Sequence, residues 1–580
     1  MGVVSGVGLV LGLCMFLVTF APSLLPRRWL EQGLIGGTVA ALGYFVGFLL
    51  ELTADAVGRL IGLSVQVSWT MPGGFVILAG LGAALLAFGW WWSVREHRET
   101  ARLVGMPNQP AWHDIASTLV AMAFLIVLIV VTSGLNALAS MLTRGLDLFL
   151  PSLVSFVVVL VVLVVVLRML NRMVLRRALE AITRQAEKMN RRRPRGVEAP
   201  ALATRSGSPG AAQPWEDLGR RGQIFTSCGP SADQIAATVG EPALEPIRVY
   251  ATQGEAGIAG AVATAMAEVR RTGALNRSVI VVDTPAGRGW VDEFSVQAVE
   301  YLTGGDCATI SIQYSKLASA FVFLADRETP RASAFALMDA LEEAIEMMAE
   351  DRRPAIYVSG ESLGSYGGHG AFVDVDDMLS RVAGGLWIGT PGFTEIARKL
   401  IHKRMRGSPE ITPVIDNGRH IRFVTKPSEL HADAYGRTLG TWESPRIVYV
   451  AHASDPMARF TAELAWREPD WMRERAGSDV NSSLRWWPLV TWFQTSTDMA
   501  TSLDTPPGHG HIYEDELVPA WAAVMHQPHA PIAAITAAIR ASVEVLKKPR
   551  DGSVTGSGSG SGSGGLLGPG GGLGGPGTSG

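Results

Sequence analysis

The stretch Ile356-Tyr357-Val358-Ser359-Gly360-Glu361-Ser362-Leu363-Gly364-Ser365-Tyr366 begins as an apolar strand and ends in a Gly-x-Ser-x-Gly turn. This pattern is typical of a sharp strand-to-helix turn that lifts the serine hydroxyl above a sheet. Small residues are needed at Gly360 and Gly364 because the turn is strained and the following helix packs close to it. Ser362 is therefore a candidate nucleophile. A five-letter motif is weak by itself, so the assignment depends on the rest of the chain.

The composition indicates a membrane protein rather than a nucleic-acid-binding protein. Of the 580 residues, 48% are hydrophobic, and the formal net charge of −3 predicts no nucleic-acid partner. The three cysteines, Cys14, Cys228 and Cys307, lie far apart and form neither a CxxC motif nor a metal-ligand spacing. The sequence therefore predicts no disulfide framework, no metal site and no cofactor.

Apolar residues are concentrated in residues 1–170, which we predict to be a transmembrane helical domain. Five runs are each long enough to cross the roughly 30 Å of bilayer hydrocarbon. These runs are 4–24, 33–52, 73–93, 114–141 and 149–170. The first run lacks a preceding basic region and further runs follow it, so we interpret it as a span rather than a signal peptide. The segment 53–72 has mixed polarity and is expected to be an interfacial loop or a short helix.

Basic residues predict the orientation of these spans. Arg27 and Arg28 follow the first span, further arginines between Arg95 and Arg102 follow the third, and a long basic stretch starts at Arg168. The other two loops carry little positive charge, so the positive-inside rule places the basic loops in the cytoplasm. We therefore expect a multi-pass protein of the inner (cell) membrane with a cytoplasmic C-terminal domain.

The rest of the chain divides into three parts. Residues 171–214 are predicted to be a basic juxtamembrane helix and a Pro-, Ala-, Gly- and Ser-rich linker. The helix either lies at anionic lipid headgroups or is only a positive stop signal. Residues 215–550 have the texture of an α/β domain. Residues 551–580, almost wholly Gly, Ser, Pro and Leu, are interpreted as a flexible tail or an added linker.

Seven apolar runs in the α/β part predict buried strands. They are Ile247–Ala251, Val279–Asp283, Ala308–Tyr314, Ala355–Ser359, Leu386–Gly389, Ile421–Val424 and Ile447–Ala451. Candidate helices such as 256–271 and 332–350 lie between them. Continuous apolar runs are typical of strands buried on both faces. Their alternation with helices predicts a mostly parallel sheet with helices on both faces.

An acidic candidate follows Ser362 in the chain. Asp455 lies in Ala453-Ser454-Asp455-Pro456, directly after a predicted strand. The carboxyl ends of parallel strands are where active-site residues gather in open sheets, so Asp455 is the preferred acid. The alternative is an ordinary Asp-Pro turn without a catalytic role.

A base candidate lies in the loop Gly508-His509-Gly510-His511. Either histidine would take the proton of the serine and later return it to the leaving group. We prefer His509, because Glu514 follows five residues later at an expected helix start, and keep His511 as the alternative. A lone H-x-H pair without a carboxylate cluster is a poor metal site.

Two further features lie in the neighbourhood of these residues. Acyl transfer needs backbone N–H groups that face the developing oxyanion, and Leu363 and Gly287 are the candidates. Gly287 lies in a glycine-rich loop after a predicted strand, although an ordinary turn has the same composition. Between Asp455 and His509 lies a tryptophan-rich insertion, which is either a lid or acyl-chain groove, or ordinary core and membrane-facing packing.

With these residues assembled, the chain resembles the α/β-hydrolase superfamily, and in particular the actinobacterial polytopic membrane proteins that carry a C-terminal α/β-hydrolase domain. The resemblance covers nearly the whole chain except the tail and implies a Ser-Asp-His triad. It rests on Gly360 to Ser365, Ala453 to Pro456, Gly508 to His511, and Gly287 to Trp290 with Val291 and Asp292.

The leading hypothesis is a membrane-anchored serine hydrolase of esterase, lipase or thioesterase type, with an acyl-enzyme on Ser362. Its expected partners are the lipid bilayer and an acylated lipid-like substrate. An acyltransferase that uses a lipid or sugar hydroxyl differs only in the second acceptor. A non-catalytic membrane scaffold with a hydrolase-like domain is the alternative from another class. The spans either admit lipid to the site or only tether the protein or join it into homo-oligomers.

Overall fold

The computed structural model describes residues 5–61, 74–110, 112–317, 319, 321–322, 326–474 and 477–547. The predicted tail at 551–580 and part of the segment 53–72 lie outside these residues. The described part of that segment continues a long helix as far as Leu60.

Five helices form the N-terminal part. They are α1 (Gly6–Val18), α2 (Trp29–Leu60), α3 (Gly74–Leu103), α4 (His113–Leu146) and α5 (Ser152–Asn190). Within the described residues, three segments are long and apolar enough to cross a membrane: Trp29–Gly58, His113–Leu146 and Ser152–Asn190. Helix α1 is apolar but has only 13 residues, fewer than the about 20 that a span needs. The structure thus supports three candidate spans, and the larger number of about five spans remains a prediction.

Small residues allow α1 and α2 to pack closely. A Cβ atom added at Gly47 would lie 2.6 Å from the Cα atom of Gly8, so the two backbones meet where neither residue has a side chain. Such contacts are typical of helices that pack within a membrane. Helices α4 and α5, in contrast, leave most of their apolar side chains exposed on the outside of the molecule.

The C-terminal part contains a seven-stranded, wholly parallel sheet in the order β1-β3-β2-β4-β5-β7-β6. Its strands are β1 (Ile247–Thr252), β2 (Val279–Thr284), β3 (Cys307–Gln313), β4 (Ala355–Glu361), β5 (Gly384–Ile388), β6 (Ile421–Val424) and β7 (Arg446–Val450). All seven predicted strands are present. The prediction of an α/β domain with a mostly parallel sheet is confirmed.

Helices cover both faces of the sheet, as predicted. Alternate strand residues such as Ile280 and Val282 pack against the helices of one face, and Val281 and Leu386 pack against those of the other. The first face is covered by α8 (Gly257–Thr272), α11 (Glu328–Glu346), α13 (Val375–Arg381) and α14 (Glu395–His402). The second is covered by α7 (Ala232–Val239), α9 (Glu293–Leu302), α18 (Leu517–Val524) and α19 (Ile532–Lys547).

Remaining helices connect these layers or lie beside the N-terminal part. They are α6 (Gly219–Ser227), α12 (Leu363–Gly368), α15 (Pro456–Arg459), α16 (Asp470–Arg473) and α17 (Val490–Thr501). Residues 204–206 of the predicted linker run beside β1, where the Arg248 amide donates to the Thr204 carbonyl at 3.0 Å. That stretch is therefore packed onto the sheet rather than separate from it.

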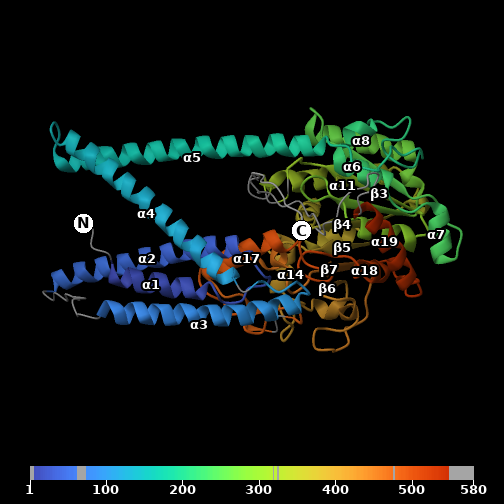
Figure 1. Cartoon of the computed structure of the whole chain (residues 1–580). Helices are drawn as coiled ribbons and strands as arrows, with labels where there is room; N and C mark the ends of the chain where they lie inside the picture. The colour runs from blue at the N-terminus through green and yellow to red at the C-terminus, as the bar shows by residue number, and fades with distance from the viewer. Residues whose placement is uncertain are drawn as a thin grey trace, which may run out of the picture.

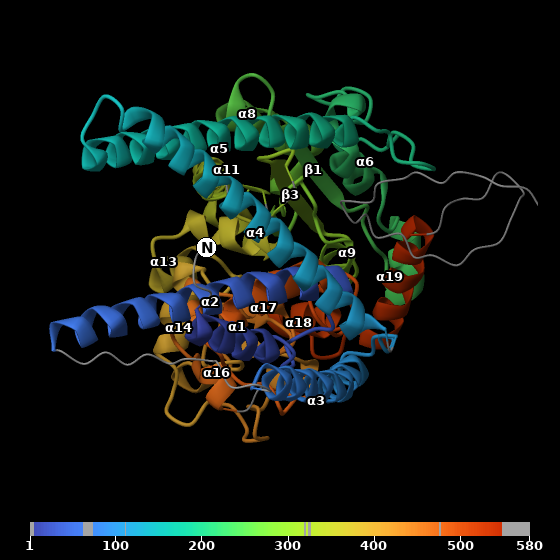
Figure 2. The ribbon, with the colours of Figure 1, turned by 60° about the vertical axis from the view of Figure 1, so that its left-hand side comes forward.

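The α/β domain meets the N-terminal helices in two places (Figure 1). Helix α5 runs along one side of the molecule and α1 to α3 along the other, and α4 crosses between them in both views (Figure 2). At the end of α5, Asn190 Oδ1 accepts from Gln313 Nε2 at 3.3 Å, and Glu187 lies 3.7 Å from Lys316. On the other side, α17 packs against α2, with Val490 buried between Ile35 and Val39.

The tryptophan-rich insertion forms much of this second contact. Trp471 is 2% exposed and packs in one cluster with Leu24, Leu25 and Val104 of the N-terminal part. Trp466, in contrast, is 66% exposed. The packing interpretation therefore holds for Trp471, which fastens the insertion to the N-terminal helices.

Candidate active site

The Gly-x-Ser-x-Gly stretch folds as a strand, a sharp turn and a helix. Ser362 stands between β4 and α12 with φ 57° and ψ −122°, a backbone conformation that non-glycine residues rarely adopt. A Cβ atom at Gly360 would lie 2.7 Å from the carbonyl carbon of Gly364, and one at Gly364 would collide with the carbonyl oxygen of Thr284. Only glycine fits at both positions, which explains the motif in physical terms.

The turn holds Ser362 beside the neighbouring strand β5. The Ser362 amide donates to the Ile388 carbonyl at 2.9 Å. The next residue, Gly389, lies under the ring of His511, because a Cβ atom there would be 2.5 Å from His511 Cε1. The end of β5 thus contacts both the serine turn and His511. The structure brings these two residues to the same place on the sheet edge.

Asp455 and His511 form a buried pair at this edge. His511 Nδ1 lies 2.8 Å from Asp455 Oδ2, and the same oxygen accepts from the Tyr513 hydroxyl at 2.6 Å. Asp455 also caps the short helix α15 by accepting from the Met457 amide at 2.8 Å. The Asp-Pro turn of the sequence therefore exists, and it fixes a carboxylate that is also bound to an imidazole.

The pair shifts the pKa values of both groups in the direction that favours an ion pair. Burial acts to raise the pKa of Asp455, but the charge and hydrogen bond of His511, with those of Tyr513 and Met457, hold it below its ordinary value. Burial acts to lower the pKa of His511, but Asp455 and then Glu361 raise it above its ordinary value. The His511 Nε2 atom is buried and has no hydrogen-bond partner among the described residues.

His509 lies in a different arrangement. Its Nδ1 atom is 3.4 Å from Asp479 Oδ2, and the ring is partly exposed. Ser454 donates to the same Asp479 oxygen and accepts from the Gly510 amide at 2.9 Å. His452 Nδ1 lies 3.0 Å from the Gly510 carbonyl oxygen. These hydrogen bonds together fix the loop between the two histidines. The hydrogen bonds favour His511 over His509, the reverse of the preference drawn from the sequence.

The amide candidates lie beside the serine turn. Leu363 is the first residue of α12, so its N–H has no partner within the helix. The contact between Gly364 and Thr284 places the loop after β2 next to this turn, and Gly287 lies in that loop with φ 24°. Leu363 packs against Tyr314, which is 2% exposed. The buried Tyr314 hydroxyl lies near the backbone of Gly287 but makes no hydrogen bond of normal geometry in the described part of the chain.

Three carboxyl groups lie near the base of the turn: Asp283 is buried, whereas Glu361 and Asp292 are half-buried. Burial raises the pKa of Glu361 and Asp292 above their ordinary values, and it raises that of Asp283 to about 7. Glu361 directly precedes Ser362 and accepts from Trp290 Nε1 at 3.0 Å. Glu361 therefore places a carboxyl group near His511, where it is one cause of the raised pKa of that histidine.

Sequence reasoning missed several of these residues. Tyr513, Tyr314 and Asp479 belong to no motif, and only Tyr513 stands near a residue already singled out. Gly389 ends a predicted strand, and a glycine at the carboxyl end of a strand was the one available signal of close approach.

Comparisons with known proteins agree with this architecture. Residues 247–537 match the family model described as the alpha/beta-hydrolase family, and residues 20–230 match the model of that family's N-terminus. Neither a curated protein nor a solved structure matches the chain significantly.

Proposed function

The chain belongs to the alpha/beta-hydrolase family, and from this premise we propose that it is a membrane-anchored serine hydrolase acting on an acyl ester or thioester of a lipid-like substrate. One observation carries the proposal. Ser362 occupies a strained turn at the sheet edge where Gly389 contacts His511, and His511 is bound to Asp455. This is the set of groups that nucleophilic acyl transfer requires.

Each residue has a defined role in the proposed reaction. Ser362 Oγ attacks the acyl carbon while His511 Nε2 takes its proton, and Asp455 keeps the imidazole in the required tautomer and stabilises its charged form. The tetrahedral intermediate is held by the Leu363 amide and by a donor from the loop of Gly287. His511 then returns the proton to the leaving alcohol or thiol, and water releases the acyl group by the same steps in reverse order.

The N-terminal helices support a substrate that arrives from the bilayer. Three of them are long and apolar enough to cross a membrane, and α17, which follows the Asp455 loop in the chain, packs against α2. The carboxyl ends of the strands, where the site lies, are thus joined to the helical part by the chain that follows β7. A substrate with an acyl chain in the membrane would therefore reach the site from this edge of the sheet.

Covalent labelling tests the nucleophile. A fluorophosphonate probe is expected to label the full-length protein in detergent and to fail with Ser362→Ala. Ser380→Ala, which changes an exposed serine on α13, serves as the matched control and should label normally. Equal labelling of the wild type and Ser362→Ala would overturn the proposal. Product analysis with and without an added alcohol then separates hydrolysis from acyl transfer.

The orientation in the membrane forms part of the proposal. The positive-inside pattern supports a cytoplasmic α/β domain. A reactive tag placed in the 551–580 tail should be shielded in intact cells and become accessible to an impermeant reagent only after lysis. Reaction in intact cells would place the domain on the other side of the membrane.

A further inference from the structure

Two histidines and an aspartate meet where the N-terminal helices contact the α/β domain. His97 lies near the end of α3, and His113 and Asp114 are the first two residues of α4. Their exposed fractions are 5%, 4% and 2%, so the three side chains are buried together. The proposed hydrolysis does not use them.

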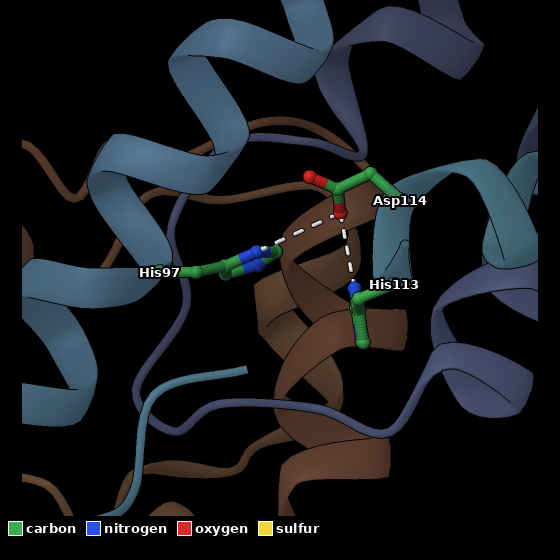
Figure 3. Close-up of side chains that lie close together, drawn as sticks. All are labelled: His97, His113 and Asp114. Carbon is green, nitrogen blue, oxygen red and sulfur yellow. Dashed lines mark hydrogen bonds and ion pairs between the residues drawn. The ribbon is translucent and has the colours of Figure 1, made fainter. Parts of the chain in front are cut away.

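The three side chains converge on one point (Figure 3). His113 Nδ1 lies 3.0 Å from Asp114 Oδ1, and His97 Nδ1 lies 3.9 Å from the same oxygen. Each of the three residues offers one ligand atom within 4.8 Å of those of the other two. In a tetrahedral site with metal–ligand bonds of about 2.0–2.1 Å, neighbouring ligand atoms are about 3.4 Å apart. The distances of 3.0 Å and 3.9 Å from Asp114 Oδ1 to the two histidines lie on either side of that value.

A backbone contact determines which ring nitrogen of His113 carries the proton in the neutral form. Its Nε2 atom lies 2.9 Å from the carbonyl oxygen of Arg27, and a carbonyl can only accept a hydrogen bond. Nε2 therefore carries the proton, and in the neutral ring Nδ1 presents a lone pair to the Asp114 carboxylate, which also only accepts. Two acceptors 3.0 Å apart are stabilised either by a proton shared between them or by a metal ion that binds both. Metal-bound histidines make this same outer contact to a carbonyl.

The buried charges of this contact region also call for a cation. Arg27 is balanced by Asp498, which lies 3.8 Å away on α17. Asp114 is buried with no arginine or lysine in an ion pair with it among the described residues, and buried Glu96 is bound by the neutral side chains of Asn481 and Trp92. Acidic side chains buried beside two imidazoles favour a bound cation.

From this geometry we propose that His97, His113 and Asp114 bind a divalent transition-metal ion, zinc in the first place. Two imidazole nitrogens and one carboxylate oxygen suit zinc, whereas magnesium and calcium prefer oxygen ligands throughout. The Ser93 hydroxyl lies 3.1 Å from His97 Nδ1. Binding of the ion to Nδ1 would replace this hydrogen bond. The ion joins α3 to α4 and, through the Arg27 carbonyl, to the loop before α2. This structural site does not depend on the proposed hydrolase activity.

Metal analysis of the full-length, tag-free protein in detergent tests the proposal. The protein purified from zinc-supplied cells should hold about one zinc ion per chain. After removal of metal with a chelator, Co²⁺ should give the visible absorption of a tetrahedral nitrogen and oxygen site, and Zn²⁺ should displace it. Zn²⁺ should also raise the melting temperature of the metal-free protein, whereas Mg²⁺ should not.

Variants connect the binding to the three residues. His97→Gln and Asp114→Asn should each lower zinc affinity by about 100-fold or more. His402→Gln, which changes an exposed histidine on α14, should bind zinc like the wild type. Should a variant fail to fold, the zinc content and Co²⁺ spectrum of the wild type decide by themselves. Substoichiometric zinc with no tetrahedral Co²⁺ spectrum, or equal affinity in wild type and folded variants, would overturn the proposal.

Discussion

Nδ1 of His511 lies 2.8 Å from Oδ2 of Asp455, and this contact distinguishes two histidines that stand two residues apart in the same loop. His509 has a carboxylate of its own, Asp479, at 3.4 Å. The two pairs differ in burial and in surroundings: His511 lies over Gly389 at the sheet edge, whereas His509 is partly exposed.

Loss of His511 should abolish acylation. His511→Ala removes the proposed general base, and we expect the acylation rate to fall by about 10⁴-fold or more. His509→Ala is the matched variant and should change this rate little, because the Asp455 contact remains intact. Single-turnover kinetics with a chromogenic ester measure both. A larger loss in His509→Ala than in His511→Ala would reverse the assignment.

The pH dependence of kcat/KM should reflect the raised pKa of His511. The imidazole acts as a base only when neutral, so activity should fall as the pH drops through a midpoint above the ordinary 6.5. Glu361 is one cause of this raised pKa, so Glu361→Gln should move the midpoint to lower pH while its side-chain oxygen still accepts from Trp290. Glu343→Gln, on the exposed face of α11, is the control. An unchanged midpoint in Glu361→Gln would refute the electrostatic link.

The Tyr314 hydroxyl is expected to contribute a hydrogen bond to the oxyanion. It is buried and makes no hydrogen bond of normal geometry in the described residues, and its ring packs on Leu363. Tyr314→Phe should lower kcat by about 10²- to 10³-fold with little change in KM, as is typical for loss of one oxyanion donor. Tyr435→Phe, an exposed tyrosine, should leave both constants unchanged. A kcat within twofold of the wild type would leave stabilisation of the oxyanion to backbone amides alone.

Gly364→Ala should distort the serine turn. The added Cβ atom would collide with the Thr284 carbonyl, so we expect a loss of stability at or above the upper end of the about 1–3 kcal/mol that overpacking costs. Gly254→Ala is the control, because a Cβ atom there meets nothing within 4 Å. Thermal unfolding in detergent compares the two. Equal melting temperatures would show that the backbone of the turn relaxes without cost.

Trp471 should be needed for the contact between the two parts of the chain. Trp471→Ala empties a buried position beside Leu24 and Leu25 and should cost about 3–5 kcal/mol. Trp466→Ala changes an exposed tryptophan of the same insertion and should stay within about 0.5 kcal/mol of the wild type. Limited proteolysis should cut the insertion faster in Trp471→Ala only. Equal cleavage of both variants would show that the insertion is held by other contacts.

The sequence predicts the sheet well because its strands are buried on both faces. Each strand is a continuous apolar run, so the pattern is independent of which partner lies beside it, and all seven runs became strands. The helical part is less well predicted. The run 4–24 has the hydropathy of a span, yet its helix ends at Val18 because the chain turns towards the α/β domain, where Leu24 and Leu25 are buried.

The candidate site could be predicted in part only. Ser362 and Asp455 are found from local patterns, because a strand followed by a turn is a local feature. The choice between His509 and His511 depends on tertiary contacts. Gly510 has φ 54°, and the chain reverses there, so the side chains on either side point to different carboxylates. Asp479 belongs to no local pattern, and the predicted strand that ends at Gly389 does not show which histidine packs on that glycine.

The cluster at His97 could not be predicted from the sequence for the same reason. Its members come from two helices whose side-by-side position depends on the whole packing of the N-terminal part. Metal motifs usually place their ligands at a helical spacing such as i and i+4. His97 and His113 do not have such a spacing.

Helix α5 is one continuous helix of 39 residues, about 58 Å long, and its far end holds the α/β domain on the side opposite to α17. A domain on a single tether would tumble above the bilayer, and its active site would face the lipid only during a fraction of encounters. Two separate attachments remove this rotation. For the proposed membrane-anchored hydrolase, the loss of orientational entropy would then belong to folding and would not be repeated with every substrate molecule, so the approach direction of the acyl group would be set before binding begins.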